Sequence, residues 1–178
     1  MFRFLLRTAG ILILLFLALQ LVRPSLPNPP VTADLQAPPD VKQVLKKSCY
    51  GCHSNETKLA WFDLTVPAYW IVRDHVLDAR KHINFSDIAK LPAAQQKAAL
   101  YEGVFQVSRG AMPIPAYVAF HPDAKMSDQD LSTLKNYLLS ISPAPKSSAA
   151  DAGAAQYEKW IASGNTNASA QAAPNGIT

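Results

Sequence analysis

The first 22 residues constrain this chain more than any other feature, because they form an apolar run without a polar face. Residues 8–22 contain no charged side chain and would extend about 22 Å as a helix, at roughly 1.5 Å per residue. With the flanking residues from Phe2 onward, and with Arg3 and Arg7 reaching toward the headgroups, the length rises to about 31 Å, close to the thickness of a hydrocarbon core. The sequence therefore predicts a transmembrane helix over residues 1–23.

A cleaved secretory signal is the alternative, because basic residues followed by an apolar run are typical of both kinds of segment. No A-x-A triplet follows the run directly, since the chain continues with RPSLP at residues 23–27. The triplet Val31-Thr32-Ala33 could serve for cleavage, but it lies well past the run, behind four prolines. We expect an uncleaved anchor, with the arginines on the cytoplasmic side and the rest of the chain across the membrane.

Composition divides the rest of the chain into three parts. Six of the 14 prolines lie in residues 24–39, which predicts an extended, stiff linker. Residues 143–178 are rich in Ala, Ser, Gly and Asn and are expected to be a disordered tail, which leaves residues 40–142 as one domain. Beyond Arg23 the chain holds 14 basic and 13 acidic side chains. Nucleic acid is therefore not an expected partner, because binding it needs dense neutralisation of phosphates.

The hydrophobic periodicity of the domain is helical. Asp40 is expected to cap a first helix, a second spans about residues 67–82, a third runs from Pro92 to about Arg109, and Ser127 caps the last. No alternating run of β-branched residues competes with these patterns, so we expect an all-α domain with long ordered loops at 54–66 and 110–126. The residues predicted to face inward include Val41, Val44, Leu45, Tyr69, Val72, Val76, Leu100, Val104, Leu131, Leu134 and Leu138.

The chemistry is concentrated in CYGCH at residues 49–53, a C-x-x-C-H motif that is the attachment signature of c-type haem. Two thiols three residues apart at the end of a helix can each add to one vinyl group of a porphyrin, and the adjacent imidazole then lies under the iron. A thioredoxin-like dithiol would need a βαβ context, a zinc site would need further ligands, and a two-residue disulfide would be strained. The motif predicts one covalent haem c, held by Cys49 and Cys52, with His53 as the proximal iron ligand.

Residues 49–73, CYGCHSNETKLAWFDLTVPAYWIVR, resemble the small bacterial haem-binding domain proteins, which are cytochrome c-like chains with an N-terminal hydrophobic segment. The resemblance covers about residues 28–141 and includes KHINFS at 81–86, GAMP at 110–113 and FHPDA at 120–124. It departs at residues 59–62, where the family typically has Trp-Pro-Trp-Tyr and this chain reads LAWF. The resemblance implies a cytochrome c-like helical fold around one haem. It implies haem binding more firmly than any particular biochemical function.

The remaining wall of the haem pocket is predicted from a methionine and several aromatic residues. Met112 lies in a Gly-Ala-Met-Pro-Ile-Pro loop between the third and last helices, and class I cytochromes c have a Met followed by Pro at a comparable position. We expect Met112 to be the distal iron ligand, with a Met that fills the core as the alternative and Met126 as a weaker candidate. Trp61, Tyr69 and Trp70 are expected to line the haem crevice, because the macrocycle replaces much of the core in so small a domain.

The other histidines are assigned supporting roles. His82 is expected to interact with the carbonyls at the end of its helix, with iron ligation or a hydrogen bond to a haem propionate as alternatives. His75 lies two helical turns from His82, too far for both to chelate one ion. His121 precedes a proline in a turn and is expected to be structural.

Together these features predict a membrane-tethered, single-haem electron carrier of the bacterial cytoplasmic membrane, with its haem domain in the periplasm, where c-type haem is attached. Cleavage of the N-terminal segment would instead give a soluble periplasmic protein. The expected partners are the lipid bilayer and redox proteins whose identity the sequence does not give. An enzyme is not expected, because no constellation of an open iron position and a distal acid–base group is evident. Two alternatives stay open: a haem-based sensor or peroxidase-like protein with His82 near the distal side, and a structural haem subunit of a membrane complex.

Overall fold

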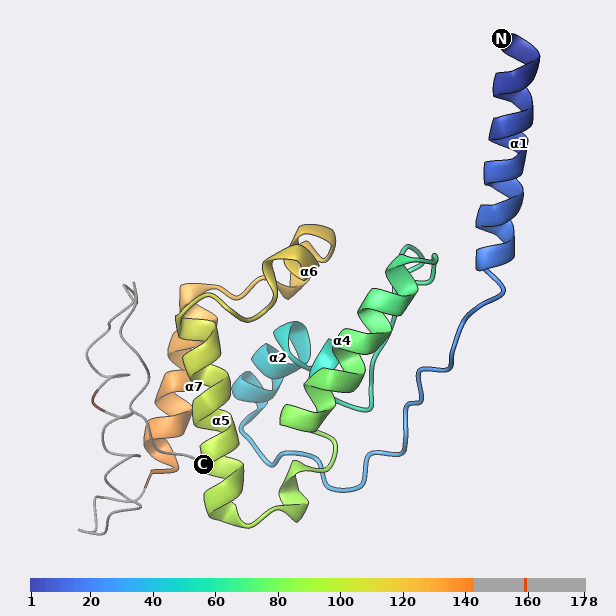
Figure 1. Cartoon of the computed structure of the whole chain (residues 1–178). Coiled ribbons are helices and arrows are strands. Elements are labelled where there is room, and N and C mark those ends of the chain that lie inside the picture. The colour runs from blue at the N-terminus through green and yellow to red at the C-terminus, as the bar shows by residue number, and fades with distance from the viewer. Residues whose placement is uncertain (143–158, 160–178) are drawn as a thin grey trace.

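The computed structural model describes residues 1–142 and Lys159, which form helices, turns and loops without a strand. An N-terminal helix, α1 (Phe2–Leu19), stands apart from a helical domain (Figure 1). The domain consists of α2 (Pro39–Ser48), α3 (Tyr50–His53), α4 (Ala68–His82), α5 (Ala93–Ser108), α6 (Pro115–Phe120) and α7 (Asp128–Ser140), with short 3-10 helices η1 (Ile88–Lys90) and η2 (Pro122–Ala124). The predicted all-α class is confirmed. The tail predicted over residues 143–178 lies, apart from Lys159, outside the described residues.

The helix ends follow the capping signals in the sequence. Ser127 and Asp130 form a capping box, in which the Ser127 side chain accepts from the Asp130 backbone and the Asp130 carboxylate accepts from the Ser127 backbone. α5 begins directly after Pro92, whose fixed φ suits a helix start. α2 begins one residue before Asp40, so this carboxylate lies in the first turn near the positive end of the helix rather than at the cap itself.

The loop expected at residues 110–126 contains two helical segments that the hydrophobic pattern did not predict. Gly110 takes a φ of 74°, which turns the chain out of α5 at a conformation that favours glycine. Helix α6 then starts with Pro115 in its first turn and has only six residues, too few for a hydrophobic period to be recognised. The segment is therefore partly helical rather than the uninterrupted loop that we expected.

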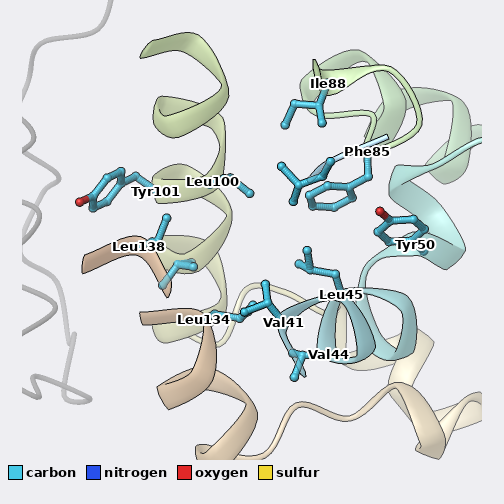
Figure 2. Packing of buried hydrophobic residues seen from close by; sticks show 12 residues of the cluster. Val41, Val44, Leu45, Tyr50, Phe85, Ile88, Leu100, Tyr101, Leu134 and Leu138 are labelled. Atoms are coloured by element: carbon cyan, nitrogen blue, oxygen red, sulfur yellow. The ribbon is translucent and has the colours of Figure 1, made fainter. Parts of the chain in front are cut away.

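The core is built where α2, α5 and α7 meet the chain that follows α4 (Figure 2). Tyr50 and Phe85 stack with their ring centroids 5.1 Å apart. The Tyr50 hydroxyl donates to Asp34 at 2.6 Å and accepts from Lys42 at 2.8 Å, so the polar end of this buried ring has its partners. The apolar residues packed around this pair include Val41, Val44, Leu45, Ile88, Leu100, Val104, Leu134 and Leu138.

Among the described helices, α1 alone is long and apolar enough to cross a membrane. None of its residues is buried against the domain. Its length and composition suit either a membrane anchor or a signal sequence, and both belong to chains that meet a membrane.

The chain that follows α1 is extended and hydrogen-bonded to the domain; we call residues 20–30 the strap. At its start, the Gln20 side chain donates to the carbonyl of Val66 at 3.1 Å and accepts from the Val66 N–H at 2.9 Å. Donors on one face of α4 then pair with successive strap carbonyls: Tyr69 with Pro24 at 2.5 Å, Arg73 with Ser25 at 2.9 Å and Arg80 with Pro27 at 2.6 Å. The first residues of the proline-rich stretch predicted as a stiff linker thus lie along α4.

The cap of α7 makes a testable contribution to stability in acid. Burial alone would raise the pKa of Asp130, but hydrogen bonds from Lys47 and Ser127 outweigh it and hold the pKa at about 2, against a usual value of 3.8. Because the folded state has the lower pKa, this stabilisation is complete above about pH 4 and is lost as the pH falls toward about 2. Asp130→Asn should therefore lower the urea midpoint at neutral pH, and the difference from wild type should shrink on acidification. A difference that does not change with pH would contradict this assignment.

Candidate functional site

One helical turn presents the two cysteines and His53 together. The N–H of Cys49 donates to Leu45 at the end of α2 at 2.8 Å, and the N–H groups of Cys52 and His53 donate to the Cys49 carbonyl at 3.1 and 2.9 Å. Cys49 and Cys52 are not disulfide-bonded. Burial raises the pKa of Cys49 to about 12 and also raises the pKa of Cys52, so both groups are neutral thiols. They lack the lowered pKa that marks the nucleophilic cysteine of a thioredoxin-like pair.

His53 is held from one side by the end of α4. Its Nδ1 lies 3.1 Å from the carbonyl oxygen of Ala79 and 3.2 Å from that of Ile83. Since both partners are acceptors, Nδ1 carries the proton and donates it. Burial lowers the pKa of this imidazole, so the ring is neutral at pH 7. Nε2 keeps its lone pair and is directed away from α4, which is how backbone carbonyls orient a histidine that binds a metal.

His53 lines a cavity of about 460 Å³ between α4 and α5, a volume in the range of small-molecule and cofactor sites. Both cysteines and Met112 line the same cavity. Most of the remaining wall is apolar and includes Val41, Leu45, Val72, Ile83, Phe85, Leu100, Val104, Val107, Ile114, Leu134 and Leu138. An apolar cavity in which two thiols, an imidazole nitrogen and a thioether converge fits a haem.

Met112 reaches the cavity from the side of α5, whereas His53 is fixed to α4. The N–H groups of Ala111 and Met112 both donate to the carbonyl of Gln106, at 2.9 and 3.2 Å, so the loop folds back on the end of α5. Residues of α4 and α5 form the two side walls of the cavity. His53 and Met112 are thus held by different helices and line one cavity, so both could bind an iron placed there.

The turn that follows the motif, residues 54–57, is polar and yet largely buried. The Ser54 side chain is fully buried and accepts from the N–H of Glu56 at 2.9 Å. The N–H of Asn55 donates to the hydroxyl of Ser86 at 2.9 Å, and Ser86 is itself fully buried. These bonds supply partners for groups that would be costly to bury alone, and they fix the path of the chain directly after His53.

Arg80 joins this turn to α4 and to the strap. Its Nε donates to the carbonyl of Ser54 at 2.8 Å, and its Nη2 donates to the hydroxyl of Thr57 at 2.9 Å. Its Nη1 donates to the carbonyl of Pro27 at 2.6 Å. Nothing in the hydrophobic pattern of α4 distinguished Arg80 from the other charged residues of that helix, so sequence reasoning missed it.

The other predicted ligands take different positions. His75 and His82 are exposed at the mouth of the cavity, and Nε2 of His82 lies 3.7 Å from the carboxylate of Asp78. Both histidines belong to α4, the helix whose C-terminal end holds His53. Met126 packs against the core and does not line the cavity. Within residues 1–142, no three His, Cys, Asp or Glu side chains form a cluster suited to a metal ion.

The three aromatic residues predicted for the haem crevice do not line the cavity. Tyr69 and Trp70 donate to carbonyls of the strap, at Pro24 over 2.5 Å and at Val22 over 2.7 Å. Trp61 is 80% exposed. The rings of Tyr69 and Trp70 therefore lie against the strap, and the ring of Trp61 is on the surface.

Tyr117, on the unpredicted helix α6, is an aromatic residue that does line the cavity. Its ring stacks on His121 with centroids 4.1 Å apart, and Nε2 of His121 donates to the buried carboxylate of Asp63 at 3.1 Å. A side chain on Gly51 would bring a Cβ to 3.1 Å from the Tyr117 hydroxyl, which is an unusually tight contact. Gly51, between the two cysteines, was thus the one sequence signal that a large side chain, here Tyr117, packs against the C-x-x-C-H motif.

A family model described as a haem-binding domain matches residues 10–140 of the chain. The matched range includes every residue that lines the cavity. No curated protein and no solved structure matches the chain.

Arg80 and Arg73 provide a matched pair for testing how the site is held. Arg80→Ala should reduce the free energy of unfolding by about 2 kcal/mol, because the Thr57 hydroxyl loses its donor and the Ser54 carbonyl keeps only the longer bond of 3.4 Å from that hydroxyl. Arg73→Ala removes the same charge from the same helix but breaks only exposed hydrogen bonds, for which a loss below about 1 kcal/mol is expected. Urea unfolding of the two variants measures the difference. Equal losses would show that Arg80 does not hold the turn after His53.

Proposed function

Because the chain belongs to the haem-binding domain family, we propose that it is a membrane-anchored electron carrier with one haem bound covalently through Cys49 and Cys52. One observation carries the proposal: a single apolar cavity is lined by both thiols, by the oriented imidazole of His53 and by the thioether of Met112. Haem supplies an iron that accepts and donates one electron. The protein supplies the attachment, the axial ligands and the exclusion of water.

Covalent attachment is supported by the position of the thiols. Cys49 and Cys52 lie on one helical turn with His53 and face the same cavity. Each thiol would add across one vinyl group, its sulfur and its hydrogen going to the two vinyl carbons, so that the step consumes no oxidant. Neutral, uncrosslinked thiols are the form that this addition starts from.

Two side chains that would each bind the iron, His53 and Met112, favour an electron carrier over a catalyst. His53 would bind the iron through Nε2, since Nδ1 is committed to the carbonyls of Ala79 and Ile83. Met112 would bind from the α5 side, and a thioether ligand raises the reduction potential. With both ligands in place, little would rearrange when an electron arrives or leaves. His82 would be poorly placed as a distal acid–base group, because it belongs to the same helix that holds His53.

A periplasmic location and an uncleaved anchor complete the proposal. Helix α1 is apolar and exposed along its whole length, and its arginines at positions 3 and 7 favour a cytoplasmic N-terminus. The domain would then lie on the other side of the bacterial cytoplasmic membrane, where covalent haem attachment takes place. The redox partners are other proteins of that compartment or of the membrane.

Extraction with acid acetone tests the covalent bond. We expect the haem to stay with the polypeptide of the wild-type protein, because thioether bonds survive unfolding. Met112→Ala should retain it as well, since this variant keeps both cysteines. Cys49→Ala combined with Cys52→Ala should release all haem to the solvent and should fold poorly, because the domain loses its central packing element. Loss of haem from the wild-type protein would overturn covalent attachment.

Spectra of Met112→Ala test the carrier against the sensor or peroxidase-like alternative. If Met112 binds the iron, the oxidised wild type should be low-spin with the weak far-red band of methionine–iron ligation. The reduced form should bind carbon monoxide poorly. Met112→Ala should become high-spin or recruit another ligand, and its reduction potential should fall.

Met126→Ala is the matched control, because Met126 packs against the core outside the cavity and its loss should leave the spectrum unchanged. A wild-type protein that is already high-spin and binds carbon monoxide readily would overturn the six-coordinate carrier.

A further inference from the structure

Three exposed apolar side chains gather beside the end of α1, and we propose that they rest on the surface of the lipid bilayer. This interfacial patch consists of Trp61, Leu64 and Phe120, which are 80%, 39% and 71% exposed. Phe62 joins its two ends, with its ring centroid 5.6 Å from that of Trp61 and 6.3 Å from that of Phe120. The inference rests on the proposed anchoring by α1 and adds a second membrane contact to it.

The strap holds the patch at the level where α1 leaves the domain. Gln20, at the end of α1, exchanges two hydrogen bonds with the backbone of Val66. Trp61 and Leu64 lie in the turn just before Val66, where the N–H of Leu64 donates to the carbonyl of Trp61 at 3.3 Å. In Figure 1, the domain end of α1 is level with α6 and with the N-terminal end of α4. A bilayer crossed by α1 would therefore begin at the height of the patch.

A further hydrogen bond between the strap and the domain fixes the position of the interfacial patch relative to the end of α1. The indole N–H of Trp70 donates to the carbonyl of Val22 at 2.7 Å, two residues beyond Gln20. The first residues after the helix are thus bonded to the domain at both Val66 and Trp70. The domain cannot turn the patch away from the membrane without breaking these bonds.

The charges around the patch suit a lipid surface. Asp63 is the one acidic residue of residues 58–66, the stretch that carries Trp61 and Leu64, and it is 4% exposed. It accepts from the N–H of Ala60 at 2.9 Å and from His121, so contact of this stretch with lipid would remove no carboxylate from water. Lys58 is exposed and can meet anionic headgroups, while tryptophan is among the residues enriched at the membrane interface. The apolar anchor beside the patch identifies lipid, rather than a second protein, as its occupant.

Cysteine labelling of the full-length holoprotein in nanodiscs tests the contact, with equal parts of phosphatidylethanolamine and phosphatidylglycerol as the lipid. Trp61→Cys and Phe120→Cys probe the patch, Leu12→Cys probes the middle of α1, and Ala94→Cys probes the exposed start of α5. Each variant reacts with a water-soluble maleimide, and mass mapping gives the rate at that position relative to the unfolded protein. A thiol in lipid reacts slowly because the reactive thiolate does not form there. The haem absorption spectrum checks that each variant is folded.

We expect Trp61→Cys and Phe120→Cys to react at least several-fold more slowly than Ala94→Cys, as Leu12→Cys does. The protein itself leaves positions 61 and 120 exposed, so slow labelling there indicates lipid. If Leu12→Cys is protected while both patch variants react like Ala94→Cys, the patch proposal is overturned and the anchor stands. If Leu12→Cys also reacts rapidly, α1 is not inserted, and the anchoring proposed above fails together with the patch.

Discussion

The fixed orientation of the His53 imidazole is the constraint on which the rest of the structure depends. Helix α3 has only four residues and cannot hold a side chain rigidly by itself. The support comes from the end of α4, where the carbonyls of Ala79 and of the capping residue Ile83 accept from Nδ1. Arg80, between these two residues, donates to the carbonyl of Ser54, directly after His53. The end of α4 therefore holds both the His53 imidazole and the backbone directly after His53 by hydrogen bonds.

Much of the fold could be predicted because its signals are local. The capping pair at Ser127, the helix start after Pro92 and the 3.6-residue period of α4 each act within a few residues. The same holds for the C-x-x-C-H motif, whose cysteines and histidine share one helical turn and whose thiols face a single cavity. Met112 was predicted to face the haem from a short motif flanked by Gly and Pro, and it lines the cavity. The path of its loop is fixed by hydrogen bonds to the end of α5, only a few residues earlier.

The aromatic residues could not be assigned from sequence because hydropathy does not say which surface a ring will meet. A proline-rich segment has few N–H donors, and its extended backbone makes no internal hydrogen bonds, so its carbonyls need donors from elsewhere. Tyr69 and Trp70 supply them, which draws these rings to the strap and away from the cavity. Tyr117 is brought to the cavity by a six-residue helix instead. The pairing of strap and α4 spans some 45 residues of chain, beyond the reach of a local pattern.

The hydrogen bonds between the strap and α4 have a consequence for encounters with other molecules. A flexible tether lets a domain sweep out a volume set by the length of its linker. The strap removes that freedom, because its carbonyls are held along α4 from Pro24 to Pro27. In an anchored chain, the cavity would keep a fixed distance from the bilayer and a fixed orientation while the molecule diffuses laterally in the membrane. Encounters between the proposed carrier and its partners would then take place in the plane of the membrane. Only molecules whose redox sites lie at the same distance from the bilayer could exchange electrons.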